Sequence, residues 1–403
     1  MARHQNTQLI QVGKADFVDG QAAVNVPVER TSTVRFVDST AWQQANAARA
    51  AGAGVRTYGR HGGATHMALE SALNELEGAE RTFLCSSGLA AITTTFLALL
   101  RPGEHILIAD NVYAPVHRLA QGILKKWGVS HAYFNGSAAD LAAKITPETR
   151  LVYAESPGSL LYTVLDIPAL AAVTRAHDLY LVLDNTWATG ALMQPLSLGA
   201  DVSLQALTKY VGGHSDLLLG AISAKAPQVI AALEHVQEDL GSVVGADDAY
   251  LALRGLRTLS ARLPVHAKQA LALAHFLEGH ALVEQVYYPA LASHPDHALW
   301  RRDFVGANGL LSFSFTEQAS EFVEVFIDRL SLFDIGASWG GYESLVLAVD
   351  SSRLDYQSAF DAQGAVVRLH VGLEHEQDLL EDVQQALLAV QAHLTNKFKE
   401  LTV

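Results

Sequence analysis

The stretch Tyr180–His214, YLVLDNTWATGALMQPLSLGADVSLQALTKYVGGH, decides the fold that this sequence predicts. Two short apolar runs within it, Tyr180–Leu183 and Val202–Leu207, have the length and composition of buried strands. The first run is followed by Asp184 and the second by Thr208-Lys209. If both runs are strands of one parallel sheet, these polar residues meet at its carboxyl edge, where open α/β sheets bind ligands.

A carboxylate and an amine at one sheet edge suit pyridoxal phosphate (PLP). Lys209 would form the Schiff base, and Asp184 would keep the ring nitrogen protonated, so that the ring withdraws electrons from a substrate. Each residue alone has an ordinary interpretation, as a solvated surface lysine and as a turn or N-cap aspartate. Their positions after two neighbouring strands favour the cofactor.

Outward from this stretch, apolar strands alternate with helices, which predicts an α/β protein with a mainly parallel sheet covered on both faces. We divide the chain into an N-terminal arm (1–55), a large domain (56–250) and a smaller α/β C-terminal domain (251–403). The predicted strands are Arg81–Leu84, His105–Ala109, Leu151–Glu155, Tyr180–Leu183, Val202–Leu204, Leu217–Ile222, Leu310–Phe315 and Val366–His370. The predicted helices are Thr65–Glu77, Leu89–Leu100, Ala114–Trp127, Ala138–Ile145, Ile167–His177, Asp247–Lys268 and Glu376–His393.

Composition narrows the function classes. The chain has 403 residues, 50% of them hydrophobic, and a net charge of -14 without a Lys/Arg run, which argues against nucleic acid and anionic membranes as partners. Cys85 is the single cysteine, so no intramolecular disulfide is possible, and we predict no metal site. The N-terminus lacks a secretory signal, and no apolar run reaches the roughly 20 residues of a membrane helix. These features predict a cytoplasmic protein.

Two segments could bind the cofactor's phosphate. Gly88 and Leu89 follow Ser86-Ser87 between a strand and a helix, where helix N-terminal amides face an anion, and Thr208 would add a hydroxyl. Tyr58 and Arg60 lie in a glycine-rich segment next to the arm, and an arginine can hold a phosphate bidentately. If the arm crosses to a neighbouring subunit, they would serve that subunit's site. A plain N-cap and an ordinary surface loop are the alternatives.

Three further positions could act on the substrate. Tyr113 could stack on the pyridine ring and relay a proton to a leaving group, or it could be a half-buried core tyrosine. Arg368 lies in an apolar strand, where a buried charge needs a partner such as a substrate carboxylate. Ser338 and Trp339, before two glycines, could form a wall beside that carboxylate, although an ordinary glycine turn is the alternative.

These residues, taken in order, resemble the Cys/Met-metabolism family of PLP-dependent enzymes, and within it the bacterial β-lyase branch. The resemblance covers about residues 20 to 395. Trp187 and the run Ser338–Ser344 favour the β-lyase branch over the γ-lyase and synthase branches. The motifs that carry it are Tyr58-Gly59-Arg60, Ser87-Gly88, Glu155-Ser156-Pro157-Gly158, Asp184-Asn185-Thr186-Trp187, Thr208-Lys209-Tyr210, Gly213-His214-Ser215-Asp216, Gly255-Leu256-Arg257-Thr258 and Ser338-Trp339-Gly340-Gly341-Tyr342-Glu343-Ser344.

The resemblance implies a fold of the aspartate aminotransferase-like type (fold type I) and a homotetramer of two tight dimers. It also implies β-elimination of a carbon–sulfur bond, in which cystathionine gives homocysteine, pyruvate and ammonia. The implied roles are the Schiff base (Lys209), the ring nitrogen (Asp184), stacking (Tyr113), the phosphate (Gly88, Leu89, Thr208, and Tyr58 and Arg60 of the partner) and the substrate's α-carboxylate (Arg368, Ser338, Trp339).

Two positions depart from the family pattern. Leu207 stands where many relatives have a serine, and Gln237-Glu238-Asp239 stands where an aromatic residue would face the substrate's distal arm. The second departure leaves a broader cysteine-S-conjugate lyase or a cysteine desulfhydrase open. The sequence also leaves open a γ-acting lyase or sulfhydrylase, an aminotransferase, and a cofactor-binding regulator without turnover.

Overall fold

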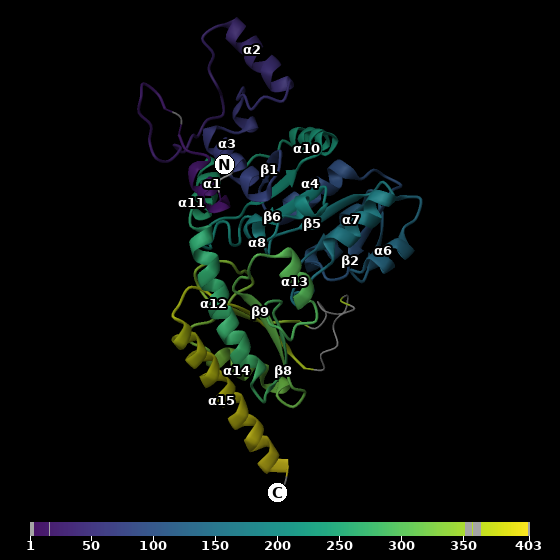
Figure 1. The fold of residues 1–403 in the computed structure, drawn as a ribbon, viewed down its shortest axis with the longest axis vertical. Coiled ribbons are helices and arrows are strands. Elements are labelled where there is room, and N and C mark those ends of the chain that lie inside the picture. The colour runs from purple at the N-terminus through teal and green to yellow at the C-terminus, as the bar shows by residue number, and fades with distance from the viewer. Residues whose placement is uncertain (1–3, 16, 351–356, 358–363, 402–403) are drawn as a thin grey trace.

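The computed structural model describes residues 4–15, 17–350, 357 and 364–401, which form two sheets and their covering helices. Figure 1 shows an elongated molecule with helix α2 (Ser39–Ala50) of the arm at one end and helix α15 (Glu376–Leu401) at the other. The long helix α12 (Leu259–Glu278) runs between the part that holds the large sheet and the part that holds the small one (Figure 1). The division into three domains stays a prediction.

The large sheet has seven strands in the order β1-β7-β6-β5-β4-β2-β3. Strand β7 is antiparallel to both of its neighbours, β1 and β6, and the pairs among β6, β5, β4, β2 and β3 are parallel. The predicted α/β fold with a mainly parallel sheet is therefore confirmed. The strands are β1 (Arg81–Cys85), β2 (His105–Ala109), β3 (Ser130–Phe134), β4 (Thr149–Glu155), β5 (Tyr180–Asp184), β6 (Val202–Ala206) and β7 (Gly220–Ala224).

Helices connect these strands and cover the sheet. Helix α3 ends where predicted, because Gly78 adopts the left-handed conformation that caps it. The helices of this part are α1 (Gln5–Gln11), α3 (Ala64–Glu77), α4 (Gly88–Leu99), α5 (Ala114–Leu119), α6 (Ala138–Lys144), α7 (Ile167–Ala176), α8 (Thr189–Leu192), α9 (Pro195–Leu198) and α10 (Pro227–Leu240), with a 3₁₀ turn at Gly59–His61 and a π-helical turn at Ala120–Leu124.

The second sheet has five strands in the order β10-β11-β12-β9-β8. Its central strand β12 is antiparallel to both neighbours and is buried along its whole length. The strands are β8 (Val283–Tyr287), β9 (Leu310–Phe315), β10 (Asp334–Ile335), β11 (Leu345–Ala348) and β12 (Val366–His370). Helices α13 (His297–Asp303) and α14 (Val323–Arg329) and a 3₁₀ turn at Ser320–Phe322 complete this part, whereas α11 (Ala246–Leu256) packs on α3 beside the large sheet (Figure 1).

Several elements differ from the predicted ones. The single helix predicted over Asp247–Lys268 is two helices, α11 and α12, separated at Arg257-Thr258. Strand β3 was not predicted, because its sequence, SHAYF, is polar and lies at the sheet edge. The helix predicted over Ala114–Trp127 is interrupted by the π-helical turn, and the last predicted strand of the large sheet lies at Gly220–Ala224 instead of Leu217–Ile222.

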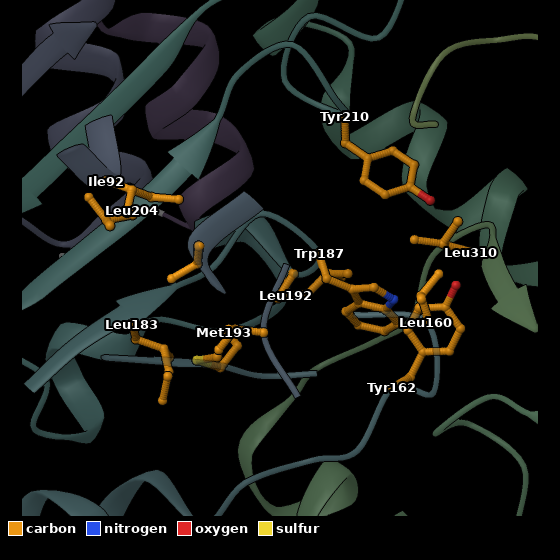
Figure 2. Close-up of a cluster of buried hydrophobic side chains, with 14 of the residues drawn as sticks. Ile92, Leu160, Tyr162, Leu183, Trp187, Leu192, Met193, Leu204, Tyr210 and Leu310 are labelled. Atoms are coloured by element: carbon orange, nitrogen blue, oxygen red, sulfur yellow. The ribbon is translucent and has the colours of Figure 1, made fainter. Parts of the chain in front are cut away.

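The buried core is continuous between the two sheets. Figure 2 shows Trp187 between Leu192, which comes from the large-sheet side, and Tyr162 with Leu310 of β9. The Trp187 ring packs edge-on against Phe304, with ring centroids 6.0 Å apart. The backbone carbonyl of Trp187 accepts a hydrogen bond of 2.6 Å from the Asn308 side chain. No helix of the described ranges is both long and apolar enough to cross a membrane.

Candidate functional site

Lys209 follows strand β6 and turns toward the second sheet. Its Nζ donates a hydrogen bond of 2.8 Å to Ser338 Oγ and lies 5.2 Å from the centre of the Trp339 ring. Burial, together with the positive charge of Arg368, lowers the pKa of Lys209 from 10.5 to about 8. An amine with this pKa is neutral in a large fraction of molecules at mildly alkaline pH, which a nucleophilic lysine requires.

Asp184 ends strand β5, next to β6 in the sheet. Its carboxylate accepts hydrogen bonds from Thr186 N (2.9 Å), Thr186 Oγ1 (2.5 Å) and Tyr153 OH (3.2 Å). Thr186 Oγ1 also accepts from Ala206 N at 2.9 Å, so this threonine ties the ends of β5 and β6 together. Burial raises the pKa of Asp184. The described partners of this carboxylate are neutral donors, so a cationic group beside it would stabilise its charge.

The turn between β1 and α4 presents a helix N-terminus at the same edge. Ser87 Oγ accepts from Ala90 N at 3.1 Å, which leaves the amides of Gly88 and Leu89 at the free end of the helix. Gly88 must be glycine, because a Cβ there would lie 2.7 Å from Ala206 Cβ. The hydroxyl of Thr208 donates to Leu219 O at 3.1 Å and accepts from Leu219 N at 3.0 Å. In the structure the Thr208 hydroxyl is thus hydrogen-bonded to the backbone of Leu219. A contact of this hydroxyl with a phosphate stays a prediction.

The predicted carboxylate-binding residues come together on the side of the second sheet. Arg368 is buried on β12, and its Nη2 donates to Gly336 O and Ser338 O, both at 3.0 Å. Two loop carbonyls therefore stabilise part of the buried positive charge of Arg368, for which the sequence analysis expected a substrate carboxylate. The loop places Ser338 and Trp339 against Lys209. We predict that a substrate carboxylate binds here, between the Arg368 guanidinium and the Lys209 amine. The roles of Arg368, Ser338 and Trp339 in binding it stay predictions.

Glu155 is a site residue to which the sequence reasoning gave no role. It ends β4 directly beside Asp184 in the strand pairing, and its Oε2 accepts from Tyr113 N at 2.7 Å. Burial, and after it the negative charge of the neighbouring Asp184, raises the pKa of Glu155. The carboxyl of Glu155 fixes the backbone of Tyr113, whose side chain stays half-exposed. The position directly after an apolar strand was the signal that could have found it.

Tyr58 and Arg60 are placed elsewhere within one chain. Arg60 Nη1 donates to Glu238 O at 2.9 Å, and Tyr58 forms a bridge with Thr33 and a ring contact with His61. Arg49 also pairs with Glu238. Arg49, Arg60, His61 and Glu238 line a cavity of about 250 Å³ between the arm, α3, β1 and α10. Within the chain, Tyr58 and Arg60 thus contact Thr33, His61 and Glu238, and their binding of a neighbouring subunit's phosphate stays a prediction.

The residues at the sheet edge fit PLP. Lys209 has an amine of lowered pKa, and Asp184 is a buried carboxylate whose described partners are all uncharged. The first, as a primary amine, suits a Schiff base, and the second suits a protonated ring nitrogen. Gly88 and Leu89 place free helix amides at the same edge, where a phosphate is stabilised.

Comparison with known proteins agrees with this assignment. A family model described as Cys/Met metabolism PLP-dependent enzyme matches residues 6–388. A cystathionine beta-lyase of Bordetella avium is 47% identical over 391 residues, which cover 96% of this chain and 98% of that protein. A cystathionine beta-lyase of Escherichia coli is 38% identical, with 94% of this chain and 96% of that protein covered. The crystal structure of a cystathionine gamma synthase from Xanthomonas oryzae pv. oryzae in complex with cystathionine superposes with a TM-score of 0.88 at 32% identity, covering 97% of this chain and all of that one.

Proposed function

The chain belongs to the Cys/Met metabolism PLP-dependent enzymes, and from this premise we propose that it is a carbon–sulfur β-lyase that cleaves cystathionine to homocysteine, pyruvate and ammonia. The contact that carries this proposal is that of the Lys209 amine with Ser338 and Trp339, beside the buried Arg368. The similarity to two beta-lyases along nearly the whole chain supports the same reaction.

When bound, PLP supplies an electron-withdrawing ring that stabilises negative charge at the substrate's Cα. The chain supplies the proton transfers and the orientation. Lys209 Nζ takes the proton from Cα, and its lowered pKa keeps a neutral amine available for this step. Arg368 holds the α-carboxylate, and Ser338 orients the amine. Tyr113, fixed by Glu155, donates a proton to the departing sulfur.

Product analysis tests the reaction. Breaking the Cβ–S bond of cystathionine yields pyruvate and homocysteine, whereas breaking the Cγ–S bond yields 2-oxobutyrate and cysteine. Purified holoenzyme should form pyruvate and homocysteine in equal amounts. Formation of 2-oxobutyrate would overturn the proposal in favour of a γ-acting lyase. A higher kcat/KM for cystine, cysteine or S-alkylcysteines than for cystathionine would replace the substrate while keeping the β-elimination.

We further propose that the enzyme is a homotetramer of cytoplasmic location, built from dimers in which the arm completes the neighbour's site. The arm supports this because α2 has no buried residue and carries the half-exposed Trp42, and because Val37 before it is 92% exposed. Tyr58 and Arg60 follow this segment. In the assembly they would lie against the neighbour's cofactor phosphate.

Mixed oligomers test the crossing arm. Chains with Lys209→Ala and chains with Arg60→Ala, each inactive or weak alone, are co-expressed and the hybrid is purified with two different tags. If Arg60 acts in the neighbouring subunit, the hybrid contains an intact site and recovers part of the wild-type activity. If Arg60 acts in its own chain, the hybrid contains no intact site, and absence of recovery would refute the crossing.

A further inference from the structure

The loop that faces Lys209, residues 336–344, has no regular secondary structure and needs an external support. The loop must hold its position closely, because Ser338 Oγ lies 2.8 Å from Lys209 Nζ and the Trp339 ring covers the same amine. Catalytic groups hold such geometry only when neighbouring residues lock them. The contacts of this loop with strand β12 and the residues after it show what locks it.

One face of β12 points at the loop. Side chains two residues apart on a strand share a face, so Arg368 and His370 point the same way. Arg368 holds the start of the loop through the carbonyls of Gly336 and Ser338. The end of the loop is held beyond the strand, where Ser344 donates to Glu374 at 2.8 Å and Leu373 N donates to Tyr342 O at 2.8 Å.

His370 contacts the middle of the loop. Its Nε2 lies 3.1 Å from Gly340 N and 3.0 Å from Gly341 O, and the ring is fully buried. Nε2 accepts from Gly340 in one tautomer and donates to Gly341 in the other, so either tautomer ties the imidazole to the loop. Burial lowers the pKa of His370 to about 3, so the ring is neutral near pH 7. It acts by hydrogen bonding, without a charge.

Gly340 connects this contact to the reactive lysine. It has a φ of +90°, and a Cβ there would lie 2.7 Å from Tyr210 N and 2.8 Å from the carbonyl carbon of Lys209. The Gly340 backbone thus rests directly on the peptide that joins Lys209 to Tyr210. The ring of Tyr210 also packs against His370, with centroids 5.8 Å apart. His370 therefore contacts Gly340 of the loop and also Tyr210, the residue after Lys209.

We infer that His370 is a positioning residue for the proposed β-elimination, which fixes the Ser338–Trp339 wall against Lys209 through the Gly340–Gly341 backbone. The inference rests on the proposed function for its effect on turnover, but the positioning itself is a property of the free chain. Its loss should loosen the wall and weaken carboxylate binding, while Asp184 at the end of β5 and Gly88 at the start of α4, both outside the second sheet, keep their positions for the cofactor.

Two substitutions separate positioning from packing. His370→Met keeps a buried side chain of similar length but loses the hydrogen bond. His370→Gln keeps an amide that can donate or accept near the position of Nε2. His266 provides the matched control: it is an equally buried histidine whose ring lies 5.4 Å from that of His370, and its Nδ1 bonds to Val371 O, outside the loop. His266→Met therefore removes a neighbouring buried hydrogen bond without touching residues 336–344.

The first measurement is hydrogen–deuterium exchange of the purified chain without substrate. We expect peptides that cover 336–344 to exchange about tenfold faster in His370→Met, because the Gly340 amide loses its acceptor, and to exchange at the wild-type rate in His370→Gln. The His266→Met control should leave these peptides unchanged. Unchanged exchange in His370→Met, or a rise spread over the whole C-terminal half, would refute a positioning role.

The second measurement is steady-state kinetics with cystathionine on the holoenzyme. We expect KM to rise about tenfold in His370→Met with a smaller change in kcat, and to return toward the wild-type value in His370→Gln. A fall in kcat alone, or the same loss in His370→Gln, would contradict the inference. If cystathionine is not turned over by the wild type, the proposed function fails, whereas the exchange measurement still decides the role of His370.

Discussion

Arg368→Ala is the change that tests the substrate-binding half of the site most directly. The guanidinium is buried, donates to the carbonyls of Gly336 and Ser338, and lies close enough to Lys209 to lower its pKa. A substrate carboxylate beside it would form a charge-assisted pair. Truncating one partner of such a buried pair costs about 2–5 kcal/mol, which at about 1.4 kcal/mol per factor of ten corresponds to a fall in kcat/KM of about 30-fold to about 4,000-fold.

The loss should appear in KM, because the carboxylate is held in the ground state as well as in the transition state. Arg368→Lys keeps the charge but loses the planar fork, so we expect an intermediate value. The assay is steady-state kinetics with cystathionine for the wild type and both variants. Circular dichroism and the visible absorbance of bound cofactor would verify that each variant is folded and loaded.

A substrate without the carboxylate makes the test specific. With an S-substituted cysteamine, in which a hydrogen replaces the α-carboxylate, the wild type has no pair to lose. Any turnover or binding of that compound should therefore differ little between the wild type and Arg368→Ala. An unchanged KM for cystathionine in Arg368→Ala would refute the role of this arginine. An equal loss for both compounds would show that the arginine supports the loop instead of the substrate.

Three further predictions rest on the same geometry. Lys209→Ala should abolish turnover and the visible absorbance of the loaded enzyme; a coloured, active variant would contradict the Schiff-base role. PLP incorporation into the free chain should speed up with pH, with a midpoint near 8 and a plateau about one pH unit above it, because the neutral Lys209 amine reacts. Stopped-flow absorbance from pH 6 to 10 measures this, and Arg368→Ala, which removes a neighbouring positive charge, should move the midpoint to higher pH. Burial raises the pKa of Glu77 from 4.5 to about 7, so the folded chain retains a proton that the unfolded chain releases, and stability should fall as pH rises through that range by about 3 kcal/mol. In urea unfolding at pH 5 to 8, Glu77→Gln should remove the part of the fall in unfolding free energy with pH that Glu77 causes. The part caused by Glu70, whose pKa is also raised to about 7, should remain.

The large sheet was predictable because its strands are short apolar runs punctuated by turns. Strand β2, strand β12 of the second sheet and the capped helix α3 lie where their residues indicated, and Asp184 ends β5 while Lys209 follows the neighbouring β6. The direction of β7 was not predictable, because an apolar run carries no sign of its orientation in a sheet. Near the break between α11 and α12, Gly255 packs on the backbone of Val211 and Gly212, a contact between distant segments that the sequence does not reveal.

The parts of the site that sequence reasoning missed are contacts between distant segments. Glu155 and Tyr153 gain meaning only once β4 lies beside β5. His370 reads in the sequence as one more residue of an apolar strand, and only the folded chain brings it to Gly340. Conversely, Arg368 stood out because a charge within an apolar run is costly to bury, and the structure shows that two loop carbonyls share in compensating it.

The two sheets divide the chemical labour of this protein between separate stretches of its gene. Asp184 and Lys209 depend on the strands between residues 81 and 224, whereas Ser338, Arg368 and His370 depend on those between 283 and 370. If Arg368 and Ser338 bind the substrate's carboxylate as proposed, mutations in the later stretch change how firmly a substrate is held, while Asp184 and Lys209 are inherited unchanged. Such an arrangement gives natural selection, and a protein engineer, a way to adjust substrate affinity by changing one half of the coding sequence.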